Sequence, residues 1–357
     1  GVSVLRAPAR INILGEHVDY VSYLPTTSLA FGSHEHAMTM LFRPTGDDKV
    51  RGASMNERFE SFEFSLGKIE PPRLGTQSLR PADSLDKTSS ERKEPFAKSG
   101  SLEGLRTQGW EEFVFNRPVP TPHWSNYVKG SVSFAQWKFG EIVKNGFDFL
   151  IDSTIPANSG ASSSSALVVL AGAAIRQTNQ VSFELSELAQ DSSQAEWFLG
   201  TRGGSLDQTA ICLAKRHQAV HLTYADNRAE TVPLQSERFR WVTFFTHAAD
   251  KGREVMLEYN ERAAVSRLII PALIQGWETQ APHSFIDWRY GEALLRDGAA
   301  KTPDTLRALL NQLPESMSLD ELSHFHPRSF QHCEAAFPAL VAERRNHPLK
   351  IRARALH

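Results

Sequence analysis

The segment Pro156-Ala-Asn-Ser-Gly-Ala-Ser-Ser-Ser-Ser-Ala166 decides the fold, because it separates two strongly apolar stretches. Residues 147–155 have the pattern of a buried strand and residues 165–178 that of an apolar helix, so a strand–loop–helix unit is predicted. Small residues let backbone N–H groups approach a phosphate, and the N-terminus of the helix directs its dipole to the same place. Serine hydroxyls add donors, and one can bind Mg²⁺. The segment therefore predicts an anion site.

The alternative is a flexible serine linker whose last residues cap the helix. A linker is not usually bracketed by an apolar strand and an apolar helix, so anion binding is favoured. No lysine follows the loop in the pattern GxxxxGK[ST], so this is not a Walker-type phosphate loop.

The surrounding sequence mixes helical and strand patterns without regular alternation, which favours an α+β fold. The segments expected to be strands, in addition to 147–155, are residues 2–5, 11–14, 35–42, 58–66, 219–222 and 241–246. The segments expected to be helical, in addition to 165–178, are residues 128–143, residues 183–198, a helix after the Gly200–Gly204 break, and most of the chain beyond 250. Residues 67–122 contain a stretch rich in Pro, Ser, Lys and Glu, and predict a long exposed insertion that is a passive surface loop rather than a lid.

Composition narrows the function classes. A chain of 357 residues suits two domains, with 41% hydrophobic and 22% charged residues. The net charge of −2 offers no basic excess, so nucleic acid is not an expected partner. Two cysteines, Cys212 and Cys333, form no motif, which suits a reducing, cytoplasmic compartment. No apolar run reaches the roughly 20 residues of a membrane span, so no membrane partner is expected.

Polar residues gather after the N-terminal strand pattern. Glu16, His17 and Asp19 follow Gly15 directly, and Arg10 precedes them. Carboxylates and an imidazole are the hydrogen-bonding groups that a polyhydroxylated substrate needs. A solvated surface turn is the alternative, and a metal site is disfavoured because the spacing matches no standard zinc pattern.

Two further carboxylates flank a glycine-rich turn. Glu196 lies near the end of a predicted helix, and Asp207 follows Gly203 and Gly204. Beside a phosphate loop, one carboxylate would help to hold Mg²⁺ and the other would face an attacking hydroxyl. Asp207 could equally be the N-cap of the next helix.

Taken together, these segments resemble the GHMP kinases, and galactokinases in particular. Residues 10–20 resemble the first galactokinase signature, PGRVNLIGEHTDY, and residues 156–166 resemble the second GHMP motif, PxGxGLSSSA. Residues 196–208 resemble the family's AEH…G…MDQ stretch. The resemblance covers most of the chain outside 67–122.

The resemblance implies a role for each matching residue. Asp207 corresponds to the acidic residue that faces the sugar hydroxyl, and Arg10 to the arginine beside it. The implied sugar contacts are Glu16, His17, Asp19, Gly204 and Tyr259. The implied ATP contacts are Ser159, Gly160, Ala161, Ser162, Ser163, Ser164 and, at the adenine, Trp124. Ser164 and Glu196 correspond to Mg²⁺ ligands.

The sequence departs from the family pattern at three places. Asn158 stands where the second motif has Gly; Asn tolerates unusual φ better than most residues. The turn after Asp19 is shorter than in the family, so the sugar is not identified. No third, glycine-rich motif follows Ile351 to His357, so an incomplete C-terminal domain is expected.

The resemblance implies a two-domain GHMP kinase fold. Residues 1–235 would form a domain like ribosomal protein S5 domain 2, and residues 236–357 a ferredoxin-like domain. The implied activity is ATP-dependent phosphorylation of a monosaccharide at its anomeric hydroxyl, with ATP and Mg²⁺. Two alternatives remain: a regulatory protein that binds sugar and ATP without turnover, and a GHMP kinase for a non-sugar alcohol. The sequence does not indicate an oligomeric state.

Overall fold

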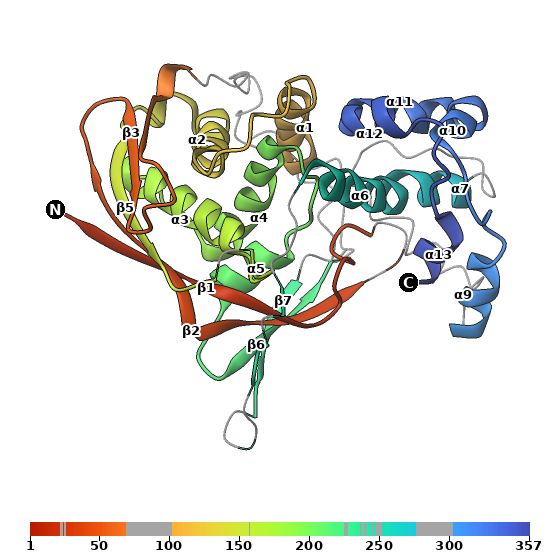
Figure 1. Cartoon of the computed structure of the whole chain (residues 1–357), viewed down its shortest axis with the longest axis horizontal. Coiled ribbons are helices and arrows are strands. Elements are labelled where there is room, and N and C mark those ends of the chain that lie inside the picture. The colour runs from red at the N-terminus through yellow and green to blue at the C-terminus, as the bar shows by residue number, and fades with distance from the viewer. Residues whose placement is uncertain are drawn as a thin grey trace, which may run out of the picture.

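The computed structural model describes residues 1–21, 24, 26–68, 102–156, 158–224, 228–235, 238, 241–244, 246–247, 252–275 and 303–357. Within these residues, seven strands form one mixed sheet, and a group of helices packs on one of its faces (Figure 1). The helices of the C-terminal half lie beside that layer, at the right of Figure 1. The predicted α+β class is confirmed.

The sheet has the strand order β4-β3-β5-β2-β6-β7, and β1 pairs with β2 outside this order. Of the strand pairs, β3 and β5 are parallel and the others are antiparallel. The strand bounds are β1 (Ser3–Leu14), β2 (Thr27–Pro44), β3 (Lys49–Ser54), β4 (Phe62–Ser65), β5 (Phe147–Ser153), β6 (Gln218–Thr223) and β7 (Arg228–Pro233).

The N-terminal strand differs from its prediction. Two short strands were expected at residues 2–5 and 11–14, but one strand, β1, runs through Pro8 without a break. Pro8 faces Ala37 of β2, and the register shifts between Pro8 and Arg10. Proline lacks an N–H and is tolerated in strands at edges and bulges, which is where Pro8 lies.

The predicted helices after the insertion are confirmed. In the N-terminal half they are α2 (Ser125–Phe139) with η3 (Gly140–Ile142), α3 (Ser163–Thr178), α4 (Leu185–Glu196) with η4 (Trp197–Leu199), and α5 (Leu206–Leu213). A short turn, η1 (Leu66–Lys68), follows β4. Apolar side chains of β2 and β5 pack against α2 and α3 to form one core, which includes Met40, Phe147, Val132 and Ile175.

Part of the expected insertion is ordered helix. The helix α1 (Leu102–Phe115) buries Trp110 and Val114, one helical turn apart, completely or nearly so. The Trp110 indole N–H donates to the carbonyl of Gln194 at 2.9 Å. The prediction of a passive surface loop is therefore wrong for this stretch, because its C-terminal end carries apolar residues that pack against the core, Phe113 and Phe115 among them. Residues 69–101 lie outside the described residues.

The strand predicted at 241–246 is also wrong. The described residues there form no strand, and Val242 and Phe244 are exposed. The Trp241 ring instead lies 5.2 Å from that of Phe31. An apolar run becomes a strand only where another strand accepts its hydrogen bonds, and none of the described strands pairs with this one.

The C-terminal half is helical where it is described. Its elements are α6 (Arg253–Ala264), a π-helical turn η5 (Val265–Ile269), α7 (Ile270–Gln275), α9 (Pro303–Leu310), α10 (Leu319–Phe325), α11 (Pro327–Ala336), α12 (Pro338–Arg344) and α13 (Ile351–Leu356). An isolated bridge joins Met317 to Leu349. The sheet expected for a ferredoxin-like domain is not among the elements described after residue 252.

A second core joins the two halves of the chain. Tyr20 and Trp197 pack in one cluster with Leu257, Ile269 and other residues of the C-terminal helices. This contact brings the end of β1 and the glycine-rich turn against α6. Among the described helices, none has the length and apolar character that crossing a bilayer requires.

Candidate functional site

Asp207 is the point at which the three polar segments meet. It lies in the first turn of α5, and Arg10 reaches it from β1. Nε and Nη2 of Arg10 each donate to Asp207 Oδ1 at 2.7 Å. Burial lowers the pKa of Arg10, but the charges of Asp207 and Glu16 outweigh it and raise the pKa overall. Arg10 therefore stays charged and holds one carboxylate oxygen in place.

The other oxygen of Asp207 faces the serine-rich loop. The hydroxyls of Ser162 and Ser165 donate to Oδ2 at 2.6 and 3.3 Å. The backbone N–H of Arg10 donates to the carbonyl of Ala161 at 3.3 Å. The strand, the loop and α5 thus form one site, as the sequence predicted.

The loop itself has an unusual backbone. Asn158, Gly160 and Ser162 all have positive φ, of 56°, 73° and 60°. Asn158 adopts the left-handed conformation that glycine would otherwise supply. Ser162 is the N-cap of α3 and contacts Asp207, so the unpaired backbone N–H groups of the first helical turn lie near that carboxylate. Such a helix start can hold an anion.

Glu196, the last residue of α4, lies on the same side of α3 as Asp207, because both carboxylates contact Ser165. Its Oε2 accepts from the Ser165 hydroxyl at 3.0 Å and from Gln208 Nε2 at 2.5 Å. Burial and the charge of Glu196 raise the pKa of Tyr127 to about 12, against a hydrogen bond with Ser164. The Ser165 hydroxyl therefore lies between Glu196 and Asp207, within hydrogen-bond distance of both, and donates its single proton to one of them at a time.

The oxygen atoms at this place suit magnesium. Carboxylate and hydroxyl groups are the ligands that Mg²⁺ takes, together with phosphate oxygens and waters. Among the described residues, no group of three or more His, Cys, Asp or Glu side chains could hold a metal by itself. The assignment of Ser164 and Glu196 as Mg²⁺ ligands therefore stays a prediction; among the contacts described, it is the Ser165 hydroxyl that reaches Glu196.

Asp19 is the most perturbed carboxyl of the N-terminal cluster. Its Oδ2 accepts from the backbone N–H of Leu206 at 3.3 Å. Burial, and then the charge of Asp207, raise its pKa to about 6. A Cβ at Gly204 would lie 2.3 Å from the Asp19 carbonyl oxygen and 2.5 Å from its carboxyl group. Asp19 and Gly204 therefore lie in direct contact beside Asp207.

The remaining sugar candidates surround this contact. The rings of His17 and Tyr259 pack edge to face at 5.8 Å, and burial lowers the pKa of His17. Burial also raises the pKa of Tyr259 well above its ordinary value. Glu16 is more exposed; it accepts from Asn12 Nδ2 at 2.6 Å and lies 3.8 Å from Arg10.

Trp124 lies apart from this group in the contacts that the structure gives it. Its ring packs edge to face on Phe62, with a centroid distance of 4.6 Å. Its indole N–H donates to the carbonyl of Glu60 at 2.8 Å. A contact with the adenine stays a prediction.

Sequence reasoning missed the arginines that support the glycine-rich turn. Arg267 donates to the carbonyls of Arg202 and Gly203 at 2.8 and 2.9 Å. Arg354 donates to the carbonyl of His17 and to the Ser266 hydroxyl. A single arginine in the apolar stretch 263–270 was the available signal for Arg267, because an isolated charge there has to find buried partners.

Two family models match the segments that contain these residues. Residues 126–215 match the family described as GHMP kinases N terminal domain, and residues 2–24 match the galactokinase galactose-binding signature. The first match includes the serine-rich loop and Asp207, and the second includes Arg10 and Asp19. The predicted resemblance to GHMP kinases is confirmed.

Galactokinases are among the proteins with similar sequences. The chain is 29% identical to galactokinase of Lactococcus lactis subsp. cremoris over 264 residues, 73% of this chain and 52% of that protein. It is 37% identical to galactokinase of Actinobacillus pleuropneumoniae over 113 residues, 31% of this chain and 29% of that protein. The chain thus spans about half the length of the Lactococcus relative.

A solved structure shows the same fold. The crystal structure of Lactococcus lactis galactokinase complexed with galactose matches with a TM-score of 0.53 and 22% sequence identity. The match covers 86% of this chain and 73% of that one. The GHMP kinase fold expected from the sequence is therefore confirmed, and the division at residues 235 and 236 stays a prediction.

Proposed function

We propose that this chain transfers the γ-phosphoryl group of ATP to the anomeric hydroxyl of a monosaccharide, giving a sugar 1-phosphate and ADP. The observation that carries the proposal is the position of Asp207. One of its oxygens is held by Arg10 and the other faces the start of α3, through Ser162. A carboxylate beside a helix start is placed to face a hydroxyl that attacks a bound phosphate.

A sugar is the acceptor that the neighbouring side chains favour. Asp19, Glu16 and His17 offer acceptors and donors within one turn of chain, and Tyr259 adds an aromatic ring. Such a mixed polar and aromatic lining suits a ring with several hydroxyl groups. The match of residues 2–24 to a galactose-binding signature supports galactose as the first sugar to test.

Asp207 would orient the attacking hydroxyl and take its proton late. In this structure Ser162 donates to Asp207 Oδ2, at the position where a sugar hydroxyl would donate instead. As the oxygen–phosphorus bond forms, the hydroxyl proton passes to Asp207 and the bond to the ADP oxygen breaks. Arg10 offsets the charge on Asp207 Oδ1, and the N–H groups of α3 receive phosphate oxygens.

Ser164 and Glu196 would hold Mg²⁺ together with the phosphates. The ion would neutralise charge on the β- and γ-phosphate oxygens. Ser159, Gly160 and Ala161 would contact the phosphates through the loop backbone. Because Asp19 and Tyr259 lie on the two sides of the expected division at residue 235, we further propose that the sugar lies between an N-terminal domain of residues 1–235 and a C-terminal domain of residues 236–357.

A panel of acceptors separates this function from its alternatives. ADP release would be measured with ATP, Mg²⁺ and, in turn, galactose, other hexoses, mevalonate and homoserine. We expect release with a hexose. Release with mevalonate or homoserine alone would favour a kinase for a non-sugar alcohol. A rise in melting temperature with sugar and an ATP analogue, but no ADP release, would favour a binding protein without turnover.

A further inference from the structure

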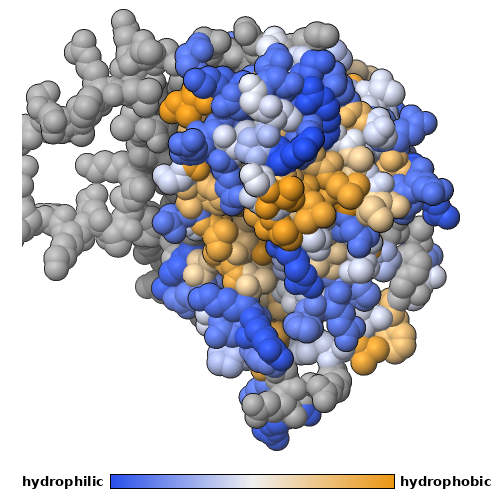
Figure 2. Space-filling model, turned by 90° about the vertical axis from the view of Figure 1, so that its left-hand side faces the viewer, coloured by the Kyte–Doolittle hydropathy of each residue, from blue (hydrophilic) through white to orange (hydrophobic). Residues whose placement is uncertain are grey.

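The face of the sheet opposite the helices carries an open apolar hollow. It has a volume of about 760 Å³ and is lined by residues of β2, β3, β4 and β5, together with Val2. Figure 2 shows this side of the molecule, where apolar side chains gather in the centre and polar ones border them. None of the helices described packs on this face (Figure 1).

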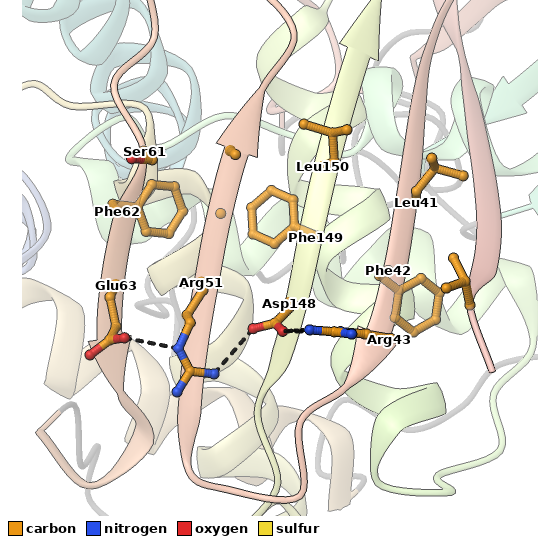
Figure 3. A pocket seen from close by; sticks show the side chains of 13 residues that line it. Leu41, Phe42, Arg43, Arg51, Ser61, Phe62, Glu63, Asp148, Phe149 and Leu150 are labelled. Carbon is orange, nitrogen blue, oxygen red and sulfur yellow. Dashed lines mark hydrogen bonds and ion pairs between the residues drawn. The ribbon is translucent and has the colours of Figure 1, made fainter.

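A row of alternating charges crosses the hollow, as Figure 3 shows. Arg43 donates to Asp148 at 3.0 Å, Asp148 accepts from Arg51 at 3.1 Å, and Arg51 donates to Glu63 at 2.9 Å. These four residues lie on β2, β5, β3 and β4, which are successive neighbours in the sheet. The signs along the row are therefore plus, minus, plus, minus.

An apolar row runs beside the charged one, two residues away from it on β2, β5 and β3. Leu41 pairs with Leu150, and Leu150 pairs with Ala53. Val4 of β1 faces Leu41. Val4 and Leu41 are 63% and 41% exposed, so this row leaves apolar area in contact with water. An exposed apolar row rimmed by charges is typical of an interaction surface.

We infer that this face binds a second copy of the same chain, in a two-fold dimer whose axis lies between β5 and β3 and runs along the strands. Rotation about that axis reverses the order of the charged row. Arg43 then faces Glu63 of the second copy, and Asp148 faces Arg51 of the second copy. All four positions meet the opposite charge, so the row is complementary to itself, as a two-fold contact requires.

The same charge pattern disfavours a two-fold axis that coincides with the charged row. An axis along the row would place each charge opposite its own copy, and four like-charged pairs would repel. The favoured axis also aligns the strands of the two sheets, which is a common way for sheets to pack. It places Leu150 opposite Ala53 of the second copy, so that a large side chain meets a small one.

Sedimentation velocity of the full chain at micromolar concentrations tests the dimer. We expect a concentration-dependent monomer–dimer equilibrium that shifts toward monomer at high salt, because the charged row is exposed to solvent. A chain that sediments as a monomer at every concentration would overturn the inference. A larger species whose mass is not that of two copies would do the same.

Two charge reversals test the proposed pairing. Arg43→Glu places a glutamate opposite Glu63 of the second copy, and Glu63→Arg places an arginine opposite Arg43 of the second copy. We expect each variant alone to raise the dimer Kd by about tenfold or more. Mixed in equal amounts they should form a heterodimer, because both outer positions then meet opposite charges.

Arg228→Glu is the matched control. Arg228 is 60% exposed in its side chain, close to the 65% of Arg43, and it pairs with a glutamate at 3.2 Å on β7, at the far edge of the sheet. The control should dimerise as the parent does. If it weakens the dimer equally, or if the mixed reversals do not recover dimer, the proposed contact is wrong.

Discussion

Arg10 and Asp207 are 197 positions apart in the chain, yet two N–H groups of Arg10 converge on a single oxygen of Asp207 at 2.7 Å. This arrangement leaves Asp207 Oδ2 for the serine-rich loop, where Ser162 and Ser165 now donate to it. One carboxylate therefore links a strand, a loop and two helices. The arrangement separates the oxygen that fixes the carboxylate from the oxygen that can face a substrate.

Replacing Arg10 by lysine tests whether the fixed position of Asp207 Oδ1 matters for activity. Lysine keeps the charge but cannot direct two fixed N–H groups at one oxygen, so Asp207 loses its orientation. We expect Arg10→Lys to lower kcat by about 10²-fold with a smaller effect on KM. Arg6→Lys, on the same strand and exposed, is the control and should change neither constant. An Arg10→Lys variant with the kcat of the parent would show that the fixed oxygen is unimportant.

The raised pKa of Asp19 predicts a pH dependence of stability. Its pKa rises from 3.8 to about 6 on folding, mainly through burial, so the folded state binds the proton more tightly than the unfolded chain. The resulting stabilisation is fully present when the pH is below 3.8, the pKa of Asp19 in the unfolded chain, and it is lost as the pH rises through about 6, the pKa in the folded state. Asp19→Asn should therefore be more stable than the parent above that pH, on the order of 1 kcal/mol, and little different near pH 4.

Chemical denaturation across this pH range measures the effect. Asp320→Asn, an exposed carboxyl of α10, is the control and should show no such difference. Asp19→Asn should also bind sugar more weakly, so stability and binding should change in opposite directions. A variant that is destabilised above pH 6 would mean that Asp19 makes stronger contacts than its burial suggests.

Gly204 is predicted to tolerate no side chain. A Cβ there would overlap both the carbonyl and the carboxyl group of Asp19. Gly204→Ala should lower the free energy of unfolding by about 1–3 kcal/mol and reduce sugar binding measured by thermal shift. Gly67→Ala is a matched control, since nothing lies within 4 Å of its Cβ position. Equal effects of the two substitutions would contradict the contact.

Ser162 combines a hydroxyl with a left-handed backbone, and two substitutions separate them. Ser162→Gly removes the hydroxyl and suits the φ of 60°, whereas Ser162→Ala removes the hydroxyl and keeps the strain. We expect Ser162→Gly to be the more stable of the two. Because the Ser162 hydroxyl lies at Asp207 in the loop proposed to hold the phosphates, we expect both variants to lose about tenfold in kcat. If the alanine variant has the lower kcat and the glycine variant keeps the kcat of the parent, the left-handed backbone rather than the hydroxyl is what matters for transfer.

Much of the site could be predicted because its residues lie in short, distinctive segments. Arg10, Asp207 and the serine-rich loop each stand where a strand or helix begins or ends, and local patterns locate such points well. The loop also carries its own backbone signal, since Asn158 and Gly160 are residue types that accept positive φ.

The contacts that sequence reasoning missed are long-range. Arg354 contacts His17 across most of the chain, and no local pattern indicates such a pairing. The helix α1 was missed because the polar composition of residues 68–109 masked a short apolar end, Trp110 to Phe115, whose packing partners are distant in the sequence. The strand expected at 241–246 had the right composition but found no neighbouring strand among the described ones. Tertiary packing decided each of these cases.

The identity of the product tests the central proposal most directly. The parent chain and Asp207→Asn would be incubated with ATP, Mg²⁺ and galactose, and the phosphorylated sugar identified by ³¹P NMR, with Asp320→Asn as the control. We expect sugar 1-phosphate in equal amount to ADP from the parent and the control, and about 10²-fold slower formation or less from Asp207→Asn. Sugar 1-phosphate formed at the parent rate by a folded Asp207→Asn variant, or ADP formed by the parent without any sugar phosphate, would contradict the account.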